Sequence, residues 1–592
     1  MDDSKNTKTT KEGGWHAAIF ITFVEFAESF AITGLRANLI TYLTNELDES
    51  LSEATKNINT WNGVLLLFPL LGGFIADSYL GRFTTIILSS LICLLGMVLL
   101  TISVSLENHH EKLFFIALYI ASVGDGGHRP CLQTFAADQF DDGTAEERDT
   151  KSSFFNWWFL TQILAAISAV FFLGYLQENV GWNKAMALQT IVWIISLSIF
   201  LVGIKRYKKQ SPTGSPFTNI AQVFVAAFRK RHVKATLHHA HGVSEQHTDQ
   251  YRFLDKAMMM DEDEVSSNVK DPWRLCTMDQ VEEVKILLGL IPISLSCVMF
   301  AVVQCQLSTF FIKQATTMQR SIAPNFKIPA ASLQGVVGIV ILFCVPIYDR
   351  VFVPIARKFT GQRSGITFCQ RIGAGLVLSV LNMVVSGFVE AKRIGVCNQH
   401  NLMDNPNAEV PISIWWLLPQ YVIIGTSDAL TVIGFQELYY DQMPEEMRSL
   451  GAAALSVVFG IGSFVNNGII AVVVAISSRF GDKWLQNNLN KAHLHHLYWI
   501  LAGLSAINLC VYVRIANVFV YKKVHMVQAV EGHHPFFLNE NNQLRFPLYW
   551  LEVSPVDKYS LDDLDEVDED DQLLFFLSEM VKSGSSVAYQ KV

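Results

Sequence analysis

The chain has 592 residues, of which 51% are hydrophobic and 17% are charged, and its mean hydropathy is positive at +0.29. Soluble proteins carry about 25% charged residues, so this composition excludes an ordinary soluble domain and predicts a protein that crosses the membrane several times. The formal charge of -9 arises largely from the C-terminal tail and the loops, and it does not indicate a nucleic-acid partner.

Apolar segments follow one another along the chain, each of a length that suits a membrane-spanning helix. They are predicted at 15–43, 61–79, 83–106, 112–137, 152–176, 184–204, 281–313, 330–349, 367–389, 411–438, 450–478 and 494–520. A polar stretch separates the first six from the last six. The sequence therefore predicts an all-α membrane protein with twelve transmembrane helices in two six-helix bundles.

The predicted domains are a cytosolic N-terminus (1–14), an N-terminal bundle (15–204), a cytosolic linker loop (205–279), a C-terminal bundle (280–523) and an acidic cytosolic tail (524–592). Cytosolic loops are rich in Lys and Arg, and here these residues gather in the linker, between the eighth and ninth segments and after the twelfth. The acidic stretch 45–60 is predicted to be a loop on the opposite side. Both termini are therefore expected in the cytosol.

Two acidic residues, Glu25 and Glu28, stand inside the first apolar segment. Residues three apart share one face of a helix, so both side chains are predicted to point the same way. An ionised group in the membrane costs several kcal/mol, which marks such a pair as a functional-site hypothesis. The alternative is a pair that neighbouring polar groups satisfy and that has no part in transport.

A weak internal duplication relates the two halves. The chain reads GGFIADSYLGR at 72–82, after the second segment, and PIYDR at 346–350, after the eighth. Both stretches place an acid at a helix end with basic residues in the following loop. Repeated halves are typical of transporters that bind substrate between them, so Asp77 and Arg82 are predicted to form part of a gate.

The tail contains an acidic run at 562–571, followed by QLLFFL at 572–577. One interpretation is an acidic dileucine sorting signal. The other is a solvated charge run followed by a short helix that docks on the cytosolic face.

Further motifs are ADQFD at 137–141, FFNWW at 154–158, QATTM at 314–318, FKIPA at 326–330 and QELYYDQMPE at 436–445. As a set they resemble the plant nitrate and peptide transporter family, a branch of the proton-coupled oligopeptide transporters. The stretch at 72–82 resembles the helix 2–3 signature of the major facilitator superfamily, to which that branch belongs. The resemblance spans about 14–523, and it implies the major facilitator fold and proton-driven uptake of a small molecule by alternating access.

The resemblance also implies an ExxER or ExxEK motif for proton coupling on helix 1, with a Lys partner on helix 4. Here Glu25 and Glu28 are kept, Ser29 replaces the base, and Arg129 stands at the Lys position. Two acids then face one base, and the unbalanced acid favours a bound proton, which predicts weakened coupling. Arg36 lies seven residues after Ser29, and it either reaches back to replace the base or points outward.

The family features that would bind a peptide are missing. The helix 5 signature FYxxxNxG falls on 158–165, where its Tyr, Asn and Gly are replaced, and Ile32 stands where relatives carry tyrosine. The His that binds nitrate in a well-known relative aligns with Gln304, and the helix 10 Glu aligns with Asp428. The substrate-binding residues implied by the resemblance are Arg129, Gln304, Phe159, Ile32 and Asp428.

Other groups of polar residues give weaker signals. Two histidine clusters, at 238–241 and 493–496, have no acid or cysteine at ligand spacing, so polar surface histidines are expected and no metal site. The nine cysteines include no CxxC pair and are interpreted as small core residues. No nucleophile, base and acid stand together, so neither an enzyme nor a cofactor is predicted.

The sequence thus predicts a secondary transporter of a small anion, with nitrate the default by resemblance, that is either proton-coupled or a weakly coupled facilitator. One alternative is a transporter of a plant hormone or specialised metabolite. An alternative of another class is a ligand sensor that signals through the C-terminal tail. The expected partners are the anionic substrate, protons and membrane lipid, and the expected location is the plasma membrane or the vacuolar membrane.

Overall fold

The structure is a computed structural model. It describes residues 13–106, 111–140, 145–209, 216–232, 251–259, 271–323, 326–360, 365–406, 408–443, 448–479 and 483–519. The tail with its acidic run and the cluster at 238–241 lie outside these residues, and so do the predictions made for them.

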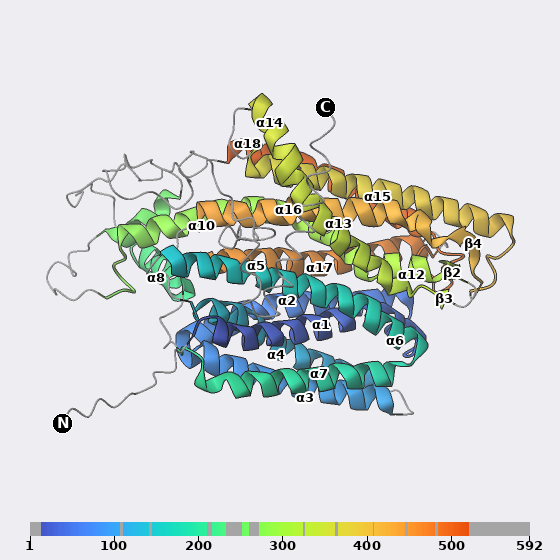
Figure 1. The fold of residues 1–592 in the computed structure, drawn as a ribbon. Coiled ribbons are helices and arrows are strands. Elements are labelled where there is room, and N and C mark those ends of the chain that lie inside the picture. The colour runs from blue at the N-terminus through green and yellow to red at the C-terminus, as the bar shows by residue number, and fades with distance from the viewer. Residues whose placement is uncertain are drawn as a thin grey trace, which may run out of the picture.

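The first half of the chain forms one bundle, drawn from blue to teal in the lower part of Figure 1. Its elements are α1 (Trp15–Asn45), α2 (Leu51–Ile75), η1 (Ala76–Leu80), α3 (Arg82–Ser105), α4 (Glu111–Ala137), α5 (Ala145–Ser168), η2 (Ala169–Leu173), α6 (Gly174–Asn179), α7 (Trp182–Val202) and η3 (Gly203–Lys205). In the linker lie α8 (Pro216–Arg229) and η4 (Arg252–Met258). The π-helical turns η1 and η2 continue α2 and α5 with no break in the chain direction.

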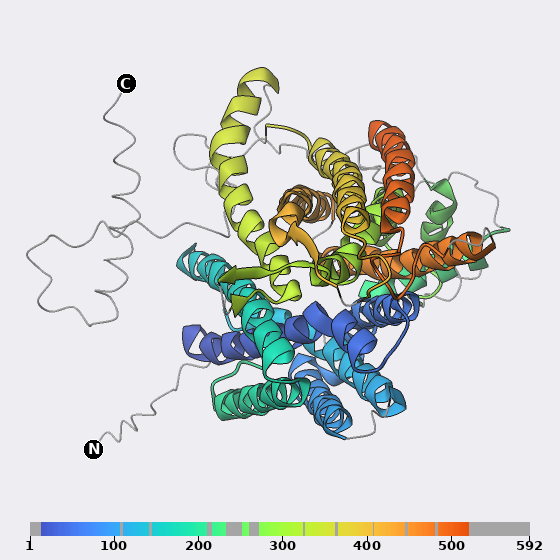
Figure 2. The same cartoon turned by 90° about the vertical axis from the view of Figure 1, so that its right-hand side faces the viewer.

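The second half forms the other bundle, drawn from green to orange (Figures 1 and 2). Its helical elements are α10 (Met278–Ser296), α11 (Val298–Cys305), η5 (Gln306–Ser308), α12 (Phe310–Thr316), η6 (Ala330–Leu333), α13 (Gln334–Ile347), η7 (Tyr348–Phe352), α14 (Val353–Thr360), α15 (Phe368–Gln399), η8 (Ile414–Leu417), α16 (Leu418–Gln442), α17 (Arg448–Arg479) and α18 (Leu494–Val518). The short strands β1 (Met318–Gln319) and β4 (Val410–Ser413) pair in parallel, and β2 (Ser321–Ala323) pairs antiparallel with β3 (Phe326–Lys327).

Ten helices in the described part of the chain are long and apolar enough to cross a membrane. The count reaches eleven if Met278–Ser296 and Val298–Thr316, which meet at a bend of 41°, form one span. The helix α4 coincides with the predicted segment 112–137, but it carries Asp125, His128 and Arg129, which make it less apolar. The helical membrane fold is confirmed, and large apolar side chains such as Phe343 and Phe388 stay exposed, as lipid-facing residues do.

The predicted loop at 45–60 is wrong from Leu51 onward, because α2 begins there. Ser50 caps this helix, and its side chain accepts a hydrogen bond of 3.3 Å from the backbone nitrogen of Glu53. The first turns of α2 are polar, so hydropathy alone does not detect them, whereas the Ser-x-x-Glu pattern is a recognised helix start.

The two bundles are joined at the end of the molecule that carries the β-strands and α6, on the right of Figure 1, which we call the closed end. Nη1 of Arg320 lies 2.7 Å from Oε2 of Glu178, an ion pair between the halves. Hydrogen bonds across the halves at this end include those from Leu51 N to Asn487 Oδ1, Asn467 Nδ2 to Thr60 Oγ1, Lys313 Nζ to Thr44 Oγ1 and Gln334 Nε2 to Ala37 O. Polar contacts between the halves therefore hold this end of the molecule closed.

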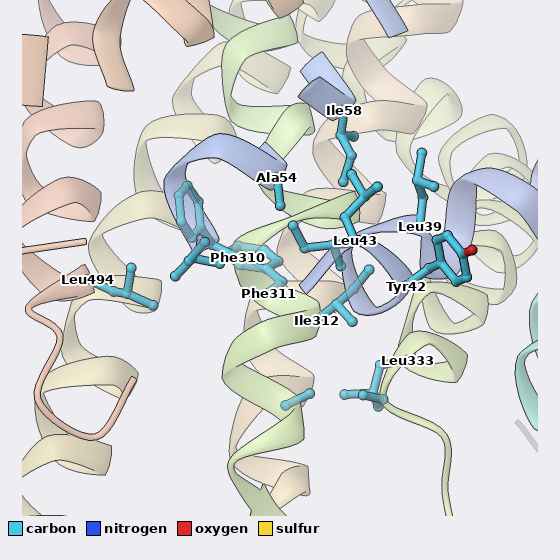
Figure 3. Close-up of a cluster of buried hydrophobic side chains, with 14 of the residues drawn as sticks. Leu39, Tyr42, Leu43, Ala54, Ile58, Phe310, Phe311, Ile312, Leu333 and Leu494 are labelled. Atoms are coloured by element: carbon cyan, nitrogen blue, oxygen red, sulfur yellow. The ribbon is translucent and has the colours of Figure 1, made fainter. Parts of the chain in front are cut away.

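Apolar packing also joins the two bundles, through one cluster of buried side chains to which both contribute (Figure 3). α1 and α2 contribute Leu39, Leu43 and Ile58, and α12 contributes Phe310 and Phe311. Burying such side chains stabilises a contact by about 1.5–3 kcal/mol each, although lipid tails supply part of this favourable environment in a membrane.

Within the N-terminal bundle, α2 and α4 touch through glycine. A Cβ atom added at Gly72 would collide with the carbonyl oxygen of Gly126, so neither helix has room for a larger side chain there. Small residues of this kind allow two membrane helices to pack backbone against backbone.

A first prediction concerns Glu49, which lies in the connection between α1 and α2, outside both spans. Burial raises the pKa of Glu49 from 4.5 to about 7, and the charges of Glu111 and Glu53 add to this, against two hydrogen bonds from Asn57. The folded chain therefore binds this proton more tightly than the unfolded chain, and the stability that it contributes is lost as the pH rises from about 4.5 to about 7.

We expect Glu49→Gln to raise the thermal unfolding temperature of the detergent-solubilised protein at pH 8 and to leave it unchanged at pH 4, measured by thiol-reactive dye fluorescence. Asn57→Ala removes the hydrogen bonds that favour the ionised carboxylate, so it should lower the unfolding temperature at pH 8. An equal effect of Glu49→Gln at both pH values would contradict this account.

Candidate functional site

Glu28 is buried against α4. It lies on α1 with 1% of its surface exposed, and Nδ1 of His128 lies 2.5 Å from its Oε2 atom. Its other oxygen, Oε1, lies 3.6 Å from Nε of Arg129. The helix-1 acid and the helix-4 cation that the sequence predicted as partners thus face each other, with an imidazole beside them.

Glu25 is buried one turn earlier, with 4% exposed, and hydrogen bonds from neutral groups hold it. Its Oε1 atom accepts from Nε2 of Gln162 on α5 at 2.7 Å and from Oγ of Ser29 at 3.0 Å. Ser29, the residue that replaces the family base, therefore donates a hydrogen bond to the acid that a base would have neutralised. Such bonds stabilise a carboxylate but bring no compensating charge.

A third carboxyl group, Asp125, belongs to the same cluster. It is fully buried on α4, three and four residues before His128 and Arg129, so the three side chains share one helix face. Asp125 interacts electrostatically with Arg129 and Glu28. The cluster thus contains three carboxyl groups, one guanidinium and one imidazole. With the imidazole protonated, the three carboxylates face two positive charges within the cluster, and Arg36, which also lies within electrostatic reach of Asp125, supplies a third.

Arg129 is half-exposed, with 41% of its side chain accessible, although it stands in the middle of the bundle. Arg36 on α1 lies within electrostatic reach of Arg129 and of Cys305 on α11. Nε of Arg36 donates to Oδ1 of Asn62 on α2 at 2.8 Å. Arg36 therefore neither replaces the base missing at Ser29 nor points outward, and it brings a second guanidinium toward the C-terminal bundle.

The other four predicted substrate residues lie in three places. In the C-terminal bundle, Nε2 of Gln304 donates to Oδ1 of Asp428 at 3.2 Å, so α11 and α16 are joined there. Phe159 is half-buried on α5, one turn before Gln162 and on the same helix face. Ile32 is 5% exposed and belongs to the apolar cluster that both bundles share.

Asp77 and Arg82 lie at the end of the N-terminal bundle opposite the closed end. Nε of Arg82 lies 3.3 Å from Oδ1 of Asp77, and its Nη1 atom lies 2.5 Å from Oδ2 of Asp138, at the end of α4. The turn η1 brings Asp77 toward Arg82, and the ADQFD motif supplies Asp138. The guanidinium of Arg82 therefore joins the ends of α2, α3 and α4.

The C-terminal bundle has a related group, although its arginine lies outside the stretch 346–350 that was compared with 72–82. Nε of Arg350 lies 3.7 Å from Oδ2 of Asp349, the preceding residue of η7, so this ion pair does not join two helices. The arginine that spans helices is Arg371 on α15, whose Nη1 atom donates to both carboxylate oxygens of Glu437 on α16 at 2.8 Å. Its guanidinium also lies 4.1 Å above the ring of Tyr348.

Sequence reasoning missed several residues of these sites: His128, Asp125, Gln162, Asp138, Arg371 and Glu437. Helix periodicity was a usable signal for one of them, because Asp125 and Arg129 stand four apart on α4. Gln162 lies within 158–165, the stretch aligned with the helix 5 signature. There the sequence analysis considered only the Tyr, Asn and Gly that are replaced, and so it passed over Gln162.

Comparisons with known proteins agree on the kind of molecule. The model of the POT family, PTR2, matches residues 83–485. Protein NRT1/PTR FAMILY 5.4 of Arabidopsis thaliana is 51% identical over 88% of this chain and 98% of its own length. Protein NRT1/PTR FAMILY 5.10 of the same plant is 41% identical, with 88% and 96% covered.

Solved structures share the fold at low sequence identity. An auto-inhibited POT family peptide transporter superposes with a TM-score of 0.67 at 19% identity, covering 85% of this chain and 97% of its own. The POT family transporter PepTSo gives a TM-score of 0.66 at 18% identity, with 85% and 98% covered.

A second prediction tests the pair of Glu28 and His128. Removing one partner of a buried charged pair typically costs about 3–5 kcal/mol, because the other group stays buried without compensation. We expect His128→Ala to lower the thermal unfolding temperature clearly and Glu28→Gln/His128→Ala to recover part of the loss, measured in the same detergent. Purely additive losses in this double-mutant cycle would mean that the two groups do not interact.

Proposed function

The chain belongs to the POT family of membrane transporters, and we propose that it moves a small anion across the membrane by alternating access between its two bundles. One observation carries this proposal: Arg36 and Arg129 come within electrostatic reach of each other, from two different helices of the N-terminal bundle. Two like charges held close together repel, the carboxylate of Asp125 relieves part of this repulsion, and a substrate anion bound beside Arg129 would relieve more of it.

The chemistry of the two arginines suits a planar oxyanion. A guanidinium presents N–H donors in a rigid fork that matches carboxylate and similar oxygens, and it stays charged at any working pH. On the opposite bundle, Gln304 offers a neutral amide, which donates hydrogen bonds without adding charge. Nitrate fits this combination, and the resemblance to nitrate transporters makes it the first substrate to test.

We propose that protons drive this transport through the cluster of Glu25, Glu28, Asp125, His128 and Arg129. Ser29 removes the family base, which by itself favours a weakly coupled facilitator. His128 offsets that loss, because an imidazole 2.5 Å from Glu28 can carry a proton with it through the transport cycle. With the imidazole neutral, three carboxyl groups face two guanidinium groups, those of Arg129 and Arg36, and this excess of carboxyl groups favours a proton bound to the cluster.

Two other functions stay open to the same experiments. A plant hormone or specialised metabolite is the main alternative substrate, since Ile163 and Ile32 replace polar family residues. A ligand sensor would bind without much flux and signal through the tail, and deletion of 524–592 without any change in uptake would count against it. The plasma membrane and the vacuolar membrane are the expected locations.

A third prediction concerns the substrate. In oocytes that express the chain, we expect saturable uptake of ¹⁵N-labelled nitrate or of one member of a panel of organic anions, and little uptake of a dipeptide. Arg129→Gln should abolish that uptake, and Arg129→Lys should retain part of it. Arg350→Gln is the matched control, because it removes an exposed guanidinium at the end opposite the closed end. Robust dipeptide uptake, or full activity of Arg129→Gln, would refute the anion proposal.

A fourth prediction concerns coupling. We expect uptake to be several-fold faster at pH 5.5 than at pH 7.5 and to carry inward current under voltage clamp. His128→Gln should flatten this pH dependence, and adding Ser29→Arg to that variant should restore it, because the introduced guanidinium would supply the missing charge beside Glu25. Wild-type uptake that is equal at both pH values and carries an outward current, because the anion enters without protons, would favour the facilitator instead.

A further inference from the structure

Three histidines gather at the start of α18, far from the carboxyl cluster on α1 and α4. One nitrogen atom from each of His493, His495 and His496 lies within 4.8 Å of the other two. The ring centroids are 4.1 Å apart for His495 and His496, 5.4 Å for His493 and His495, and 5.5 Å for His493 and His496. All three side chains are half-buried.

The backbone holds the three residues in one turn. The backbone nitrogen of His493 donates to the carbonyl oxygen of Trp484 at 2.9 Å, and that of His496 donates to the carbonyl oxygen of His493 at 3.0 Å. The ring of Trp484 lies against His496, with centroids 4.7 Å apart. The cluster is therefore built by the connection before α18 as well as by the helix itself.

Two positive charges near the cluster, those of Arg393 and Lys491, are paired with carboxylates. Nη2 of Arg393 lies 2.6 Å from Oε1 of the buried Glu390, and Nζ of Lys491 lies 2.6 Å from Oδ1 of Asp404. The positive charges that would repel a cation are thus matched by carboxylates. Neutral imidazoles suit zinc, copper and nickel, whereas magnesium and calcium prefer oxygen ligands.

We propose that His493, His495 and His496 bind one transition-metal ion of the zinc class at the closed end. Zinc–nitrogen bonds of about 2.0–2.1 Å in a tetrahedral site set ligand nitrogens about 3.3 Å apart, so rotation of the half-exposed rings must draw them together by up to about 1.5 Å. Three protein ligands leave the fourth position to water. The sequence alone favoured polar surface histidines, and it is their convergence in space that changes the interpretation.

The connection before α18 links this metal site to the contact between the two bundles. Asn487, three residues after Trp484, accepts the hydrogen bond from Leu51 N that joins the two bundles. A metal ion that ties His493 to α18 would stiffen this connection and hold the closed end shut. The bound ion is therefore expected to slow transport, a consequence that rests on the proposed alternating access.

The metal site is tested with untagged full-length protein, stripped with a chelator and titrated with zinc against a chromophoric chelator. We expect the wild-type chain to bind one more zinc ion than His495→Gln/His496→Gln, and zinc X-ray absorption to show a nitrogen- and oxygen-only shell that changes in the variant. His400→Gln, an exposed histidine at the same end, is the matched control and should bind as the wild type does. Equal zinc binding by wild type and double variant would overturn the site, as would equal binding of magnesium.

A second measurement separates the metal site from the transport proposal. Zinc should reduce substrate uptake of the wild type and leave that of His495→Gln/His496→Gln unchanged, while both have the same uptake after chelation. The same metal-free uptake also shows that the variant folds. Zinc binding without any effect on uptake would keep the site and refute its effect on the closed end, whatever the substrate proves to be.

Discussion

A carboxylate inside a helical bundle must find charge or hydrogen bonds within reach, and this constraint organises the N-terminal half. Glu28 is satisfied by His128 and Arg129 of α4, and Glu25 by Gln162 of α5 and its own neighbour Ser29. Three helices must therefore keep their relative positions for either acid to stay buried. The groups that make the bundle specific in structure are the same ones that can accept and release a proton.

The two ends of the molecule are held in different ways. At the closed end the contacts cross between the halves, as with Glu178 and Arg320. At the opposite end, ion pairs lie within each half: Arg82 ties α3 to α4, and Arg371 ties α15 to α16. Ion pairs within a half keep its helices together, while the contacts between the halves can break. Two rigid bundles that rock against each other need both properties.

Hydropathy predicted the ten spans that the described helices support, because lipid-facing residues dominate each window. It failed where a helix begins with polar residues, as α2 does at Leu51, and it did not predict the 41° bend after Ser296. Periodicity placed Glu25 and Glu28 on one face. It did not select His128 as their partner, because the neighbour that faces α1 depends on how two helices cross. The duplication did not reveal the pair of Arg371 and Glu437, because it compares stretches along the chain and these two residues meet only in space.

The glycine contact between α2 and α4 has a mechanical consequence. At Gly72 and Gly126 the two helices pack backbone against backbone, and one turn or more away the side chain of Trp61 also joins them through its hydrogen bond to Ser122. α2 also lies against α17, across the boundary between the halves. A shift of α2 along α17 would therefore move α4 as well, and Arg129 with it. In the proposed transport cycle, access to Arg129 would then change while the geometry around it is preserved.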